Sequence, residues 1–259
     1  MRFPVIAYMM RCISAETLKA RRTIQLLGVI AMPTVLAVLN LALMITASRE
    51  NEYATPGGWL SFAHNTISFG SMLVLPCVVV LATAFSAHQE HDSGRWRTLM
   101  CLPVPKSSLY LGKLAVVSGL CLLSCLILFA ENILFGGLLS ILRPETGLSL
   151  ARLDVLGLLL PFLLCFVYSL LLVAVHSWLS WRVQNLVVTL GAGFFLTLIG
   201  TFLHDEPIWR VVLPWSLPSL VHAASGWQEG LVGLLYSVVG FATVSYLSCR
   251  SFVRRDVLA

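Results

Sequence analysis

The sequence predicts an all-α, polytopic membrane protein with six transmembrane helices, and its composition and apolar runs support this prediction. Of the 259 residues, 58% are hydrophobic and only 11% are charged, whereas soluble domains carry about a quarter charged residues. Long apolar runs recur along the chain, and a bilayer span needs about 20 mostly apolar residues. No interval between the runs is long enough for a separate soluble domain. We therefore treat residues 1–259 as a single transmembrane domain.

The first element that we expect is an interfacial helix over residues 8–23. Apolar residues recur there at helical spacing, whereas Arg11, Lys19 and Arg22 fall on the opposite face. This pattern is typical of a helix that lies among lipid headgroups. The alternative is a basic flank that only orients the first span. The same charges interrupt the first apolar stretch, which argues against a cleavable signal peptide.

Six apolar runs follow, and each is long enough to cross a bilayer. The predicted spans are about residues 24–47, 67–87, 109–142, 153–178, 185–203 and 231–249. Prolines at positions 33, 76 and 161 fall inside these spans. Neighbouring helices can satisfy the backbone groups that a proline leaves free, so we expect kinks rather than breaks there.

The distribution of cations predicts the orientation of the chain. Most of the 17 Lys and Arg residues lie in the N-terminal segment, between the second and third spans, at Arg182 and in the C-terminal tail. More than half of the acidic residues lie in the alternate connections. The positive-inside rule therefore places both termini in the cytoplasm. The cations form no single dense patch beside aromatic residues, so we expect no nucleic-acid partner.

The connection between the second and third spans reads EHDSGRWRTLMCLPVPKSSLYLGK over residues 90–113. It is basic and partly apolar, and Pro103 and Pro105 prevent one helix from running through it. Ser107 and Ser108 can cap the helix that follows. We predict a short amphipathic helix over residues 90–102 that lies at the cytoplasmic membrane surface.

The last external connection, residues 204–230, is too apolar for a solvated loop and too short for two further spans. Pro207, Pro214 and Pro218 interrupt it, and its three tryptophans suit the headgroup level. We predict an outer re-entrant or interfacial pair of helices that precedes the last span and acts as a lid.

Glu131 and Asn132 lie within the third predicted span. A carboxylate inside a span costs about 2.5 kcal/mol or more on insertion scales, so it should face a cavity or a partner. One hypothesis is that Glu131 lines a substrate path or carries a proton. The alternative is that it is protonated or hydrogen-bonded across a helix interface and has no role in transport.

Several catalytic motifs are missing from the sequence. It contains no GxxxxGK[ST], HExxH or GxSxG pattern, so we expect neither ATP binding nor hydrolytic chemistry in this chain. His88, Glu90, His91 and Asp92 have spacings that metal sites use. We interpret them as the polar end of the second span, and we expect no metal and no cofactor.

Two segments together resemble ABC transporter permeases of the type-2 export family. ETLKARRTIQLLGVIAMPTV resembles the N-terminal helix and first span of that family, and residues 90–113 resemble its cytoplasmic link. The tail FVRRDVL also fits. The Glu-His and Trp-Arg pairs look most like the lantibiotic-protection or bacteriocin-immunity branch, which implies a role in antibiotic resistance.

The resemblance implies a complex in the bacterial cytoplasmic membrane. Two permease chains, identical or homologous, would form the path within the lipid, and two copies of an ABC ATPase would bind ATP and Mg²⁺ below them. The residues that would couple to the ATPase are Glu90, Arg95, Trp96, Arg97, Leu99 and Met100. The N-terminal helix would make a second contact through Glu16, Lys19, Arg21 and Arg22.

The function implied by this resemblance is export of an amphipathic substrate, such as a peptide antibiotic, a lipid-like molecule or a drug. The permease would transport, and a separate chain would hydrolyse ATP. The alternative is an ATP-independent channel or a membrane-embedded enzyme that uses Glu131 and Asn132.

Overall fold

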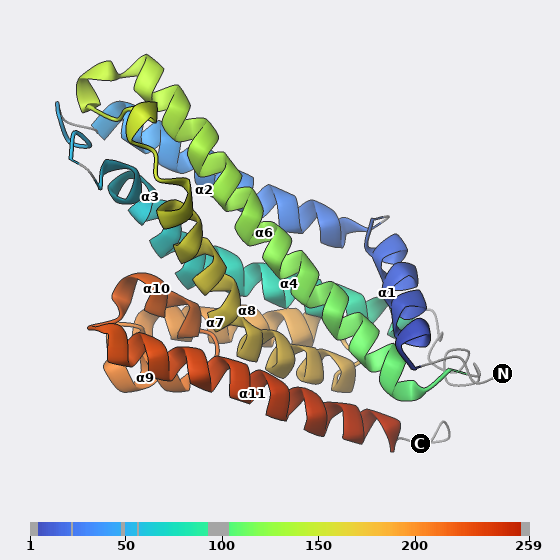
Figure 1. Ribbon diagram of the computed structural model, residues 1–259. Helices are drawn as coiled ribbons and strands as arrows, with labels where there is room; N and C mark the ends of the chain where they lie inside the picture. The colour runs from blue at the N-terminus through green and yellow to red at the C-terminus, as the bar shows by residue number, and fades with distance from the viewer. Residues whose placement is uncertain (1–4, 22, 48–49, 56, 93–103, 255–259) are drawn as a thin grey trace.

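The computed structural model describes residues 5–21, 23–47, 50–55, 57–92 and 104–254, and all regular elements in these ranges are helical (Figure 1). Six helices there are long and apolar enough to cross a membrane, which confirms the predicted all-α, six-span fold. The spans are α2 (Ile24–Ala47), α3 (Gly58–Phe69) continued through η1 (Gly70–Val74) into α4 (Leu75–Asp92), α6 (Lys106–Leu142), α7 (Val155–Arg182), α8 (Leu186–Leu203) and α11 (Trp227–Val253). The remaining elements are α1 (Val5–Arg21), η2 (Pro144–Thr146), η3 (Leu150–Arg152), α9 (Pro207–Val212), η4 (Leu217–Ser219) and α10 (Leu220–Ala223).

The helix formed by α3, η1 and α4 lies at the centre of the bundle. In its most apolar window 72% of the residues are buried, compared with 22% in α2 and 17% in α11. α4 packs against α2, α6, α7 and α8. The outward faces of α2 and α11 stay apolar, with Leu27, Leu43 and Val239 among their exposed residues. Such faces fit a protein whose solvent is lipid.

The central helix begins at Gly58, well before the start at about residue 67 that the hydropathy pattern predicts. The additional turns place Trp59 and Phe62 in the core. Trp59 packs against Gly136 of α6, where a Cβ would meet the indole ring. A π-turn, η1, joins α3 to α4. One additional residue in a π-turn changes the phase of the helix, which interrupts the regular apolar repeat along this span.

Helix α1 packs against the first half of α6 and lies at a steep angle to α2 (Figure 1). Helices α1 and α6 come close at Gly112 of α6, where a Cβ would lie only 2.9 Å from the Cβ of Cys12 in α1. Glycine at this position therefore permits the contact between α1 and α6.

Two of the long helices, α7 and α8, have a side-chain cap at the N-terminus. Asp154 accepts a hydrogen bond from the backbone nitrogen of Gly157 at 3.0 Å, at the start of α7. Asn185 accepts bonds from the backbone nitrogens of Val187 and Val188, at the start of α8. Asp and Asn are favoured at this position because they satisfy backbone donors that the first turn leaves free.

Within residues 204–230 the chain forms the short helices α9, η4 and α10, and α11 begins at Trp227. Arg210 holds this segment together and is only 6% exposed. Its guanidinium donates to the backbone oxygens of His204 (2.6 Å), Asp205 (3.0 Å) and Ala223, and it pairs with Glu229 (3.1 Å). We call residues 204–230 the outer cap, after the side of the membrane on which the sequence predicts them to lie.

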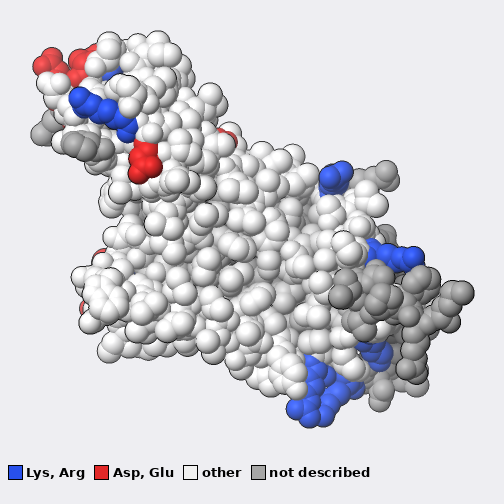
Figure 2. All heavy atoms as spheres, in the orientation of Figure 1, with Lys and Arg blue, Asp and Glu red and all other residues white. Residues whose placement is uncertain are grey.

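Charged residues gather at the two ends of the bundle, with a wide uncharged band between them (Figure 2). Lys106 begins α6, and Arg182 and Arg250 lie in the last turns of α7 and α11. We call this the basic end. Acidic side chains are more frequent at the opposite end (Figure 2).

Candidate functional site

Four charged residues from three helices meet at the basic end. Lys19 of α1 donates to Glu16 at 2.7 Å and to Oε1 of Glu90, in α4, at 2.6 Å. Lys113 of α6 donates to Glu16 at 2.8 Å and to the same oxygen of Glu90 at 2.9 Å. We call these four residues the ion cluster. It connects α1, α4 and α6 directly.

The ion cluster is largely withdrawn from solvent. The side chain of Glu90 is 0% exposed, that of Lys113 is 3% exposed and that of Glu16 is 12% exposed. Charged side chains that are this buried must be paired, because burying an unpaired charge costs a large amount of free energy. Two carboxylates and two ammonium groups alternate, so the cluster has no net charge. Oε2 of Glu90 finds no hydrogen-bond partner among the described residues.

Local geometry explains how the cluster forms. Glu16 and Lys19 are three residues apart on α1 and therefore share one face of the helix. The close approach at Gly112 brings this face against α6 next to Lys113. Burial lowers the pKa of Lys19, but hydrogen bonds to Glu16 and Glu90 outweigh that effect and raise its pKa above the usual 10.5. Lys19 is therefore held in its charged form.

The structure shows where some of the predicted coupling residues lie. Glu16, Lys19 and Glu90 pair with one another and with Lys113, so their charges are directed into the chain. Arg21 is exposed at the end of α1. The remaining predicted residues lie outside the described part of the chain: Arg22, Arg95, Trp96, Arg97, Leu99 and Met100. Their contacts with an ATPase stay a prediction.

Lys113 was not among the predicted site residues, although it belongs to the segment used for the resemblance. The available signal was a lysine eight residues into a long apolar helix that starts at Lys106. A cation at such a position requires a counter-charge. The sequence did not indicate which acid supplies it, since Glu16 lies 97 residues away.

Glu131 and Asn132 do not form a common site. Glu131 accepts a hydrogen bond from Thr34 of α2 at 2.6 Å. Asn132 is 2% exposed and its amide nitrogen donates to the backbone oxygen of Leu128 within α6. Adjacent residues of a helix point about 100° apart, so the two side chains have different surroundings.

A shallow, wide-open apolar groove of about 690 Å³ lies along the exposed face of α2 as far as Thr34, with Arg21 of α1 at its other end. Its walls are mainly aliphatic side chains such as Leu27 and Ile30. Thr34 is also the hydrogen-bond partner of Glu131. The groove therefore has a basic residue at one end and a carboxyl group beside the other.

Three histidines lie near one another at the outer cap: His204 and His222 belong to the cap, and His64 belongs to α3. The ring of His222 is 6.4 Å from that of His64 and 6.3 Å from that of His204, between centroids. Nδ1 of His222 is 3.1 Å from Oγ of Ser71. Burial, together with the positive charge that His204, His64 and Arg210 present, lowers the pKa of His222 to about 4. His222 is therefore neutral near pH 7.

No group of three or more His, Cys, Asp or Glu residues in the described ranges is arranged to hold a metal ion. Glu90, which the sequence placed in a possible ligand set with His88, is engaged by two lysines instead. The side chains of His91 and Asp92 lie outside what the structure describes.

Comparison with protein families identifies the chain at family level. Residues 12–200 match the family described as ABC-2 family transporter protein. A comparison with curated proteins finds no match. ABC-2 permeases are transport subunits without an ATPase domain, and they generally pair with ABC ATPase subunits. The match covers most of the chain, including α2, α4, α6 and α7. The chain therefore belongs to the ABC-2 family of transporter proteins and is a multi-pass membrane permease.

Proposed function

We propose that this permease is the membrane subunit of an ATP-driven exporter, and that the ion cluster transmits movement from the ATPase to the spans. One observation carries the proposal: α4 reaches the cluster through Glu90, the residue at which the predicted coupling helix of residues 90–102 begins. That segment is therefore covalently continuous with the carboxylate that contacts α1 and α6.

The cluster is suited to transmit force because its contacts are short and buried. Oε1 of Glu90 accepts from Lys19 and Lys113 at once. A displacement of the coupling helix that moves Glu90 must either move both lysines or break two buried ion pairs. Breaking a buried pair costs about 3–5 kcal/mol. Concerted movement of α1, α4 and α6 is the less costly outcome, as in rigid-body transitions between two states.

The proposed complex contains two ATPase copies and a second permease chain, identical or homologous, in a bacterial cytoplasmic membrane. Trp96, Leu99 and Met100 supply apolar anchors for the ATPase, while Arg95 and Arg97 orient it by charge. The concentration of cations at the basic end supports a cytoplasmic location for both termini. In this proposal Glu90 does not contact the ATPase but connects α4 to the lysines of α1 and α6.

The proposed substrate is amphipathic and moves outward. The groove on α2 supports this, because its aliphatic walls suit an apolar body and Glu131 offers a polar contact beside Thr34. A peptide antibiotic, a lipid-like molecule and a drug each satisfy this description. The resemblance of residues 90–113 to lantibiotic-protection permeases supports the first of these.

The experiment reconstitutes the permease with its ATPase in liposomes and measures ATPase capture, ATP hydrolysis and efflux. Trp96→Ala with Arg97→Ala should abolish capture. Glu90→Gln should keep capture but reduce efflux for each ATP hydrolysed. Trp227→Ala is the matched control, since this tryptophan is 76% exposed at the start of α11. Normal capture and efflux in the Trp96 and Arg97 variant would contradict the proposal.

The alternative function, an ATP-independent channel or enzyme, makes a different prediction. The purified permease alone would then conduct ions or turn over substrate in liposomes, and Glu131→Gln would stop it. The separate surroundings of Glu131 and Asn132 favour the exporter, because a shared catalytic or conducting site needs both groups to converge.

A further inference from the structure

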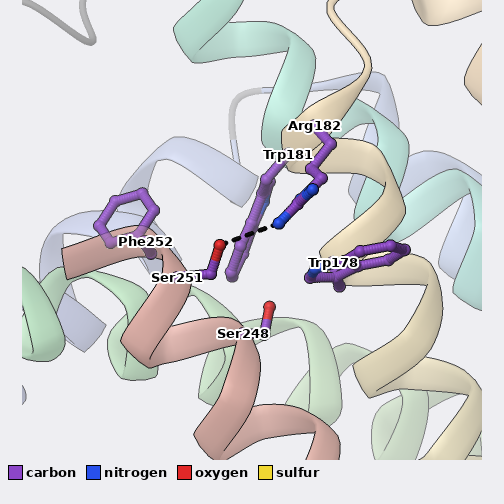
Figure 3. A pocket seen from close by; sticks show the side chains of 6 residues that line it. All are labelled: Trp178, Trp181, Arg182, Ser248, Ser251 and Phe252. Carbon is purple, nitrogen blue, oxygen red and sulfur yellow. Dashed lines mark hydrogen bonds between the residues drawn. The ribbon is translucent and has the colours of Figure 1, made fainter. Parts of the chain in front are cut away.

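A small hollow lies between the last turns of α7 and α11 at the basic end (Figure 3). Arg182, Ser248 and Ser251 contribute polar groups to it, and Trp178 and Trp181 form its walls (Figure 3). Trp181 and Ser248 are each only 5% exposed. The hollow is therefore formed by packed side chains as well as by surface groups.

The guanidinium of Arg182 is held in place at this hollow. It lies 4.8 Å from the ring centre of Trp178, and Nη2 donates to Oγ of Ser251 at 2.9 Å. A guanidinium has five N–H donors in a planar fork that matches carboxylate and phosphate groups. Stacking on an aromatic ring fixes the plane of that fork. Arg182 is thus positioned to bind an anion together with the two serine hydroxyls.

No acidic residue lines this hollow. On the other side of α11, Arg250 and Arg254 line a second hollow, which also has no acidic residue. In the described parts of α7, α8 and α11 the single acid is Glu229, which pairs with Arg210 in the outer cap. Asp256 follows in the sequence beyond the described residues. The local charge therefore favours an anion.

The size and position of the hollow narrow the choice of anion. Its volume is about 20 Å³, which suits one or two oxygen-sized atoms rather than a whole small molecule. It lies where two spans end, the level at which tryptophan and lipid headgroups occur. Leu247, one turn before Ser251 on the same row of α11, is 57% exposed. An acyl chain can lie along it while a phosphate oxygen enters the hollow.

We propose that the hollow between α7 and α11 binds the phosphate of an anionic phospholipid. A non-bridging oxygen of the phosphate replaces Ser251 as a partner of Arg182 and accepts from the serine hydroxyls. The remaining headgroup faces the membrane surface, where the other arginines of the basic end attract anionic lipids. This site is separate from the ion cluster and from the groove on α2.

The test uses the full-length protein in detergent and native mass spectrometry to count retained lipid. Phosphatidylglycerol should bind more tightly than phosphatidylcholine. Arg182→Gln should weaken phosphatidylglycerol binding about tenfold, the loss expected for a charge-assisted hydrogen bond. Arg254→Gln is the matched control, because it removes one cation from the same end but not from the hollow, and it should retain most of the binding.

Two milder variants keep the test decisive if Arg182→Gln does not fold. Arg182→Lys keeps the charge but loses the planar fork, and Ser251→Ala removes one hydroxyl, so each should reduce the preference for phosphatidylglycerol. Equal binding by wild type and both variants would overturn the proposal. Inorganic phosphate should not displace the lipid; displacement at equal concentration would identify a free phosphate site instead. Unchanged lipid binding with lost ATPase capture would assign Arg182 to a protein interface.

Discussion

Lys113→Met tests whether the ion cluster holds the basic end together. Methionine keeps the unbranched chain up to the ε position but lacks the ammonium group, so Glu90 retains only Lys19 and Glu16 loses one of its two partners. The side chain of Glu90 has no exposed surface, so water cannot replace the lost ammonium group. We expect a loss of about 3 kcal/mol in the free energy of unfolding, the lower end for a broken buried pair, because Lys19 remains.

A second substitution separates the charge effect from lost packing. Adding Glu90→Gln to Lys113→Met leaves the Glu16–Lys19 pair, at 2.7 Å, and restores a neutral cluster. We expect the double variant to be more stable than the sum of the single losses predicts by about 0.5–3 kcal/mol, the range for residues in one network.

The assay is equilibrium unfolding of the purified permease in mixed micelles, followed by tryptophan fluorescence and far-UV circular dichroism. Lys106→Met is the matched control, since Lys106 begins the same helix but is not part of the cluster. If Lys113→Met cost no more than Lys106→Met, or if the two single losses simply added, the cluster would not be an interacting unit.

Three further predictions concern Lys19, His222 and Gly193. The pKa of Lys19 is raised above 10.5. The contribution of Lys19 to stability is therefore complete below pH 10.5 and is lost as the pH rises through the raised pKa. The melting temperature should fall over that alkaline range. The pKa of His222 is lowered to about 4 from 6.5. The contribution of neutral His222 to stability is therefore complete above pH 6.5 and is lost as the pH falls towards 4. Limited proteolysis of the outer cap should increase over this range. Gly193→Ala should cost about 1–3 kcal/mol by overpacking, because a Cβ would lie 2.5 Å from Nε2 of His176.

Each of these predictions has its own control. Lys19→Arg should flatten the alkaline decline, because arginine stays charged there; an unchanged decline would assign it to other groups. His222→Gln should remove the acid-dependent proteolysis, and its persistence would point elsewhere. Gly191→Ala meets no atom within 4 Å and should be near neutral, so equal losses at positions 191 and 193 would argue against overpacking.

The spans were predictable because hydropathy depends on local composition. The caps at Asp154 and Asn185 also follow a local rule, since each residue directly precedes an apolar helix. The start of the central span was harder to predict. The polar residues His64 and Asn65 interrupt the apolar pattern there, and the π-turn changes the helical phase. The ring of Trp59 occupies space that a side chain at Gly136 would fill.

The ion cluster was not predictable from the sequence, for a different reason. Glu16, Lys19 and Glu90 were expected to face a partner protein, because the resemblance to type-2 permeases implied contacts with an ATPase. Their pairing depends on contacts between residues 71 and 97 positions apart. A single sequence contains no sign of such a contact. Arg210 and Arg182 likewise entered the sequence analysis only as positive charges. Their surroundings in the structure show that Arg210 binds groups within the outer cap, and support the proposal that Arg182 binds an anion.

The length of the central helix has a mechanical consequence. The run Gly58–Glu90 has 33 residues, so as a helix it is roughly 50 Å long. If it tilts as a rod by about 10°, one end is displaced by roughly 9 Å relative to the other. Four other spans surround it, so such a tilt cannot occur without rearranging the whole bundle. The most enclosed span is thus also the one that carries Glu90 at the basic end, and under the proposed function a displacement applied there is carried along the whole length of the helix.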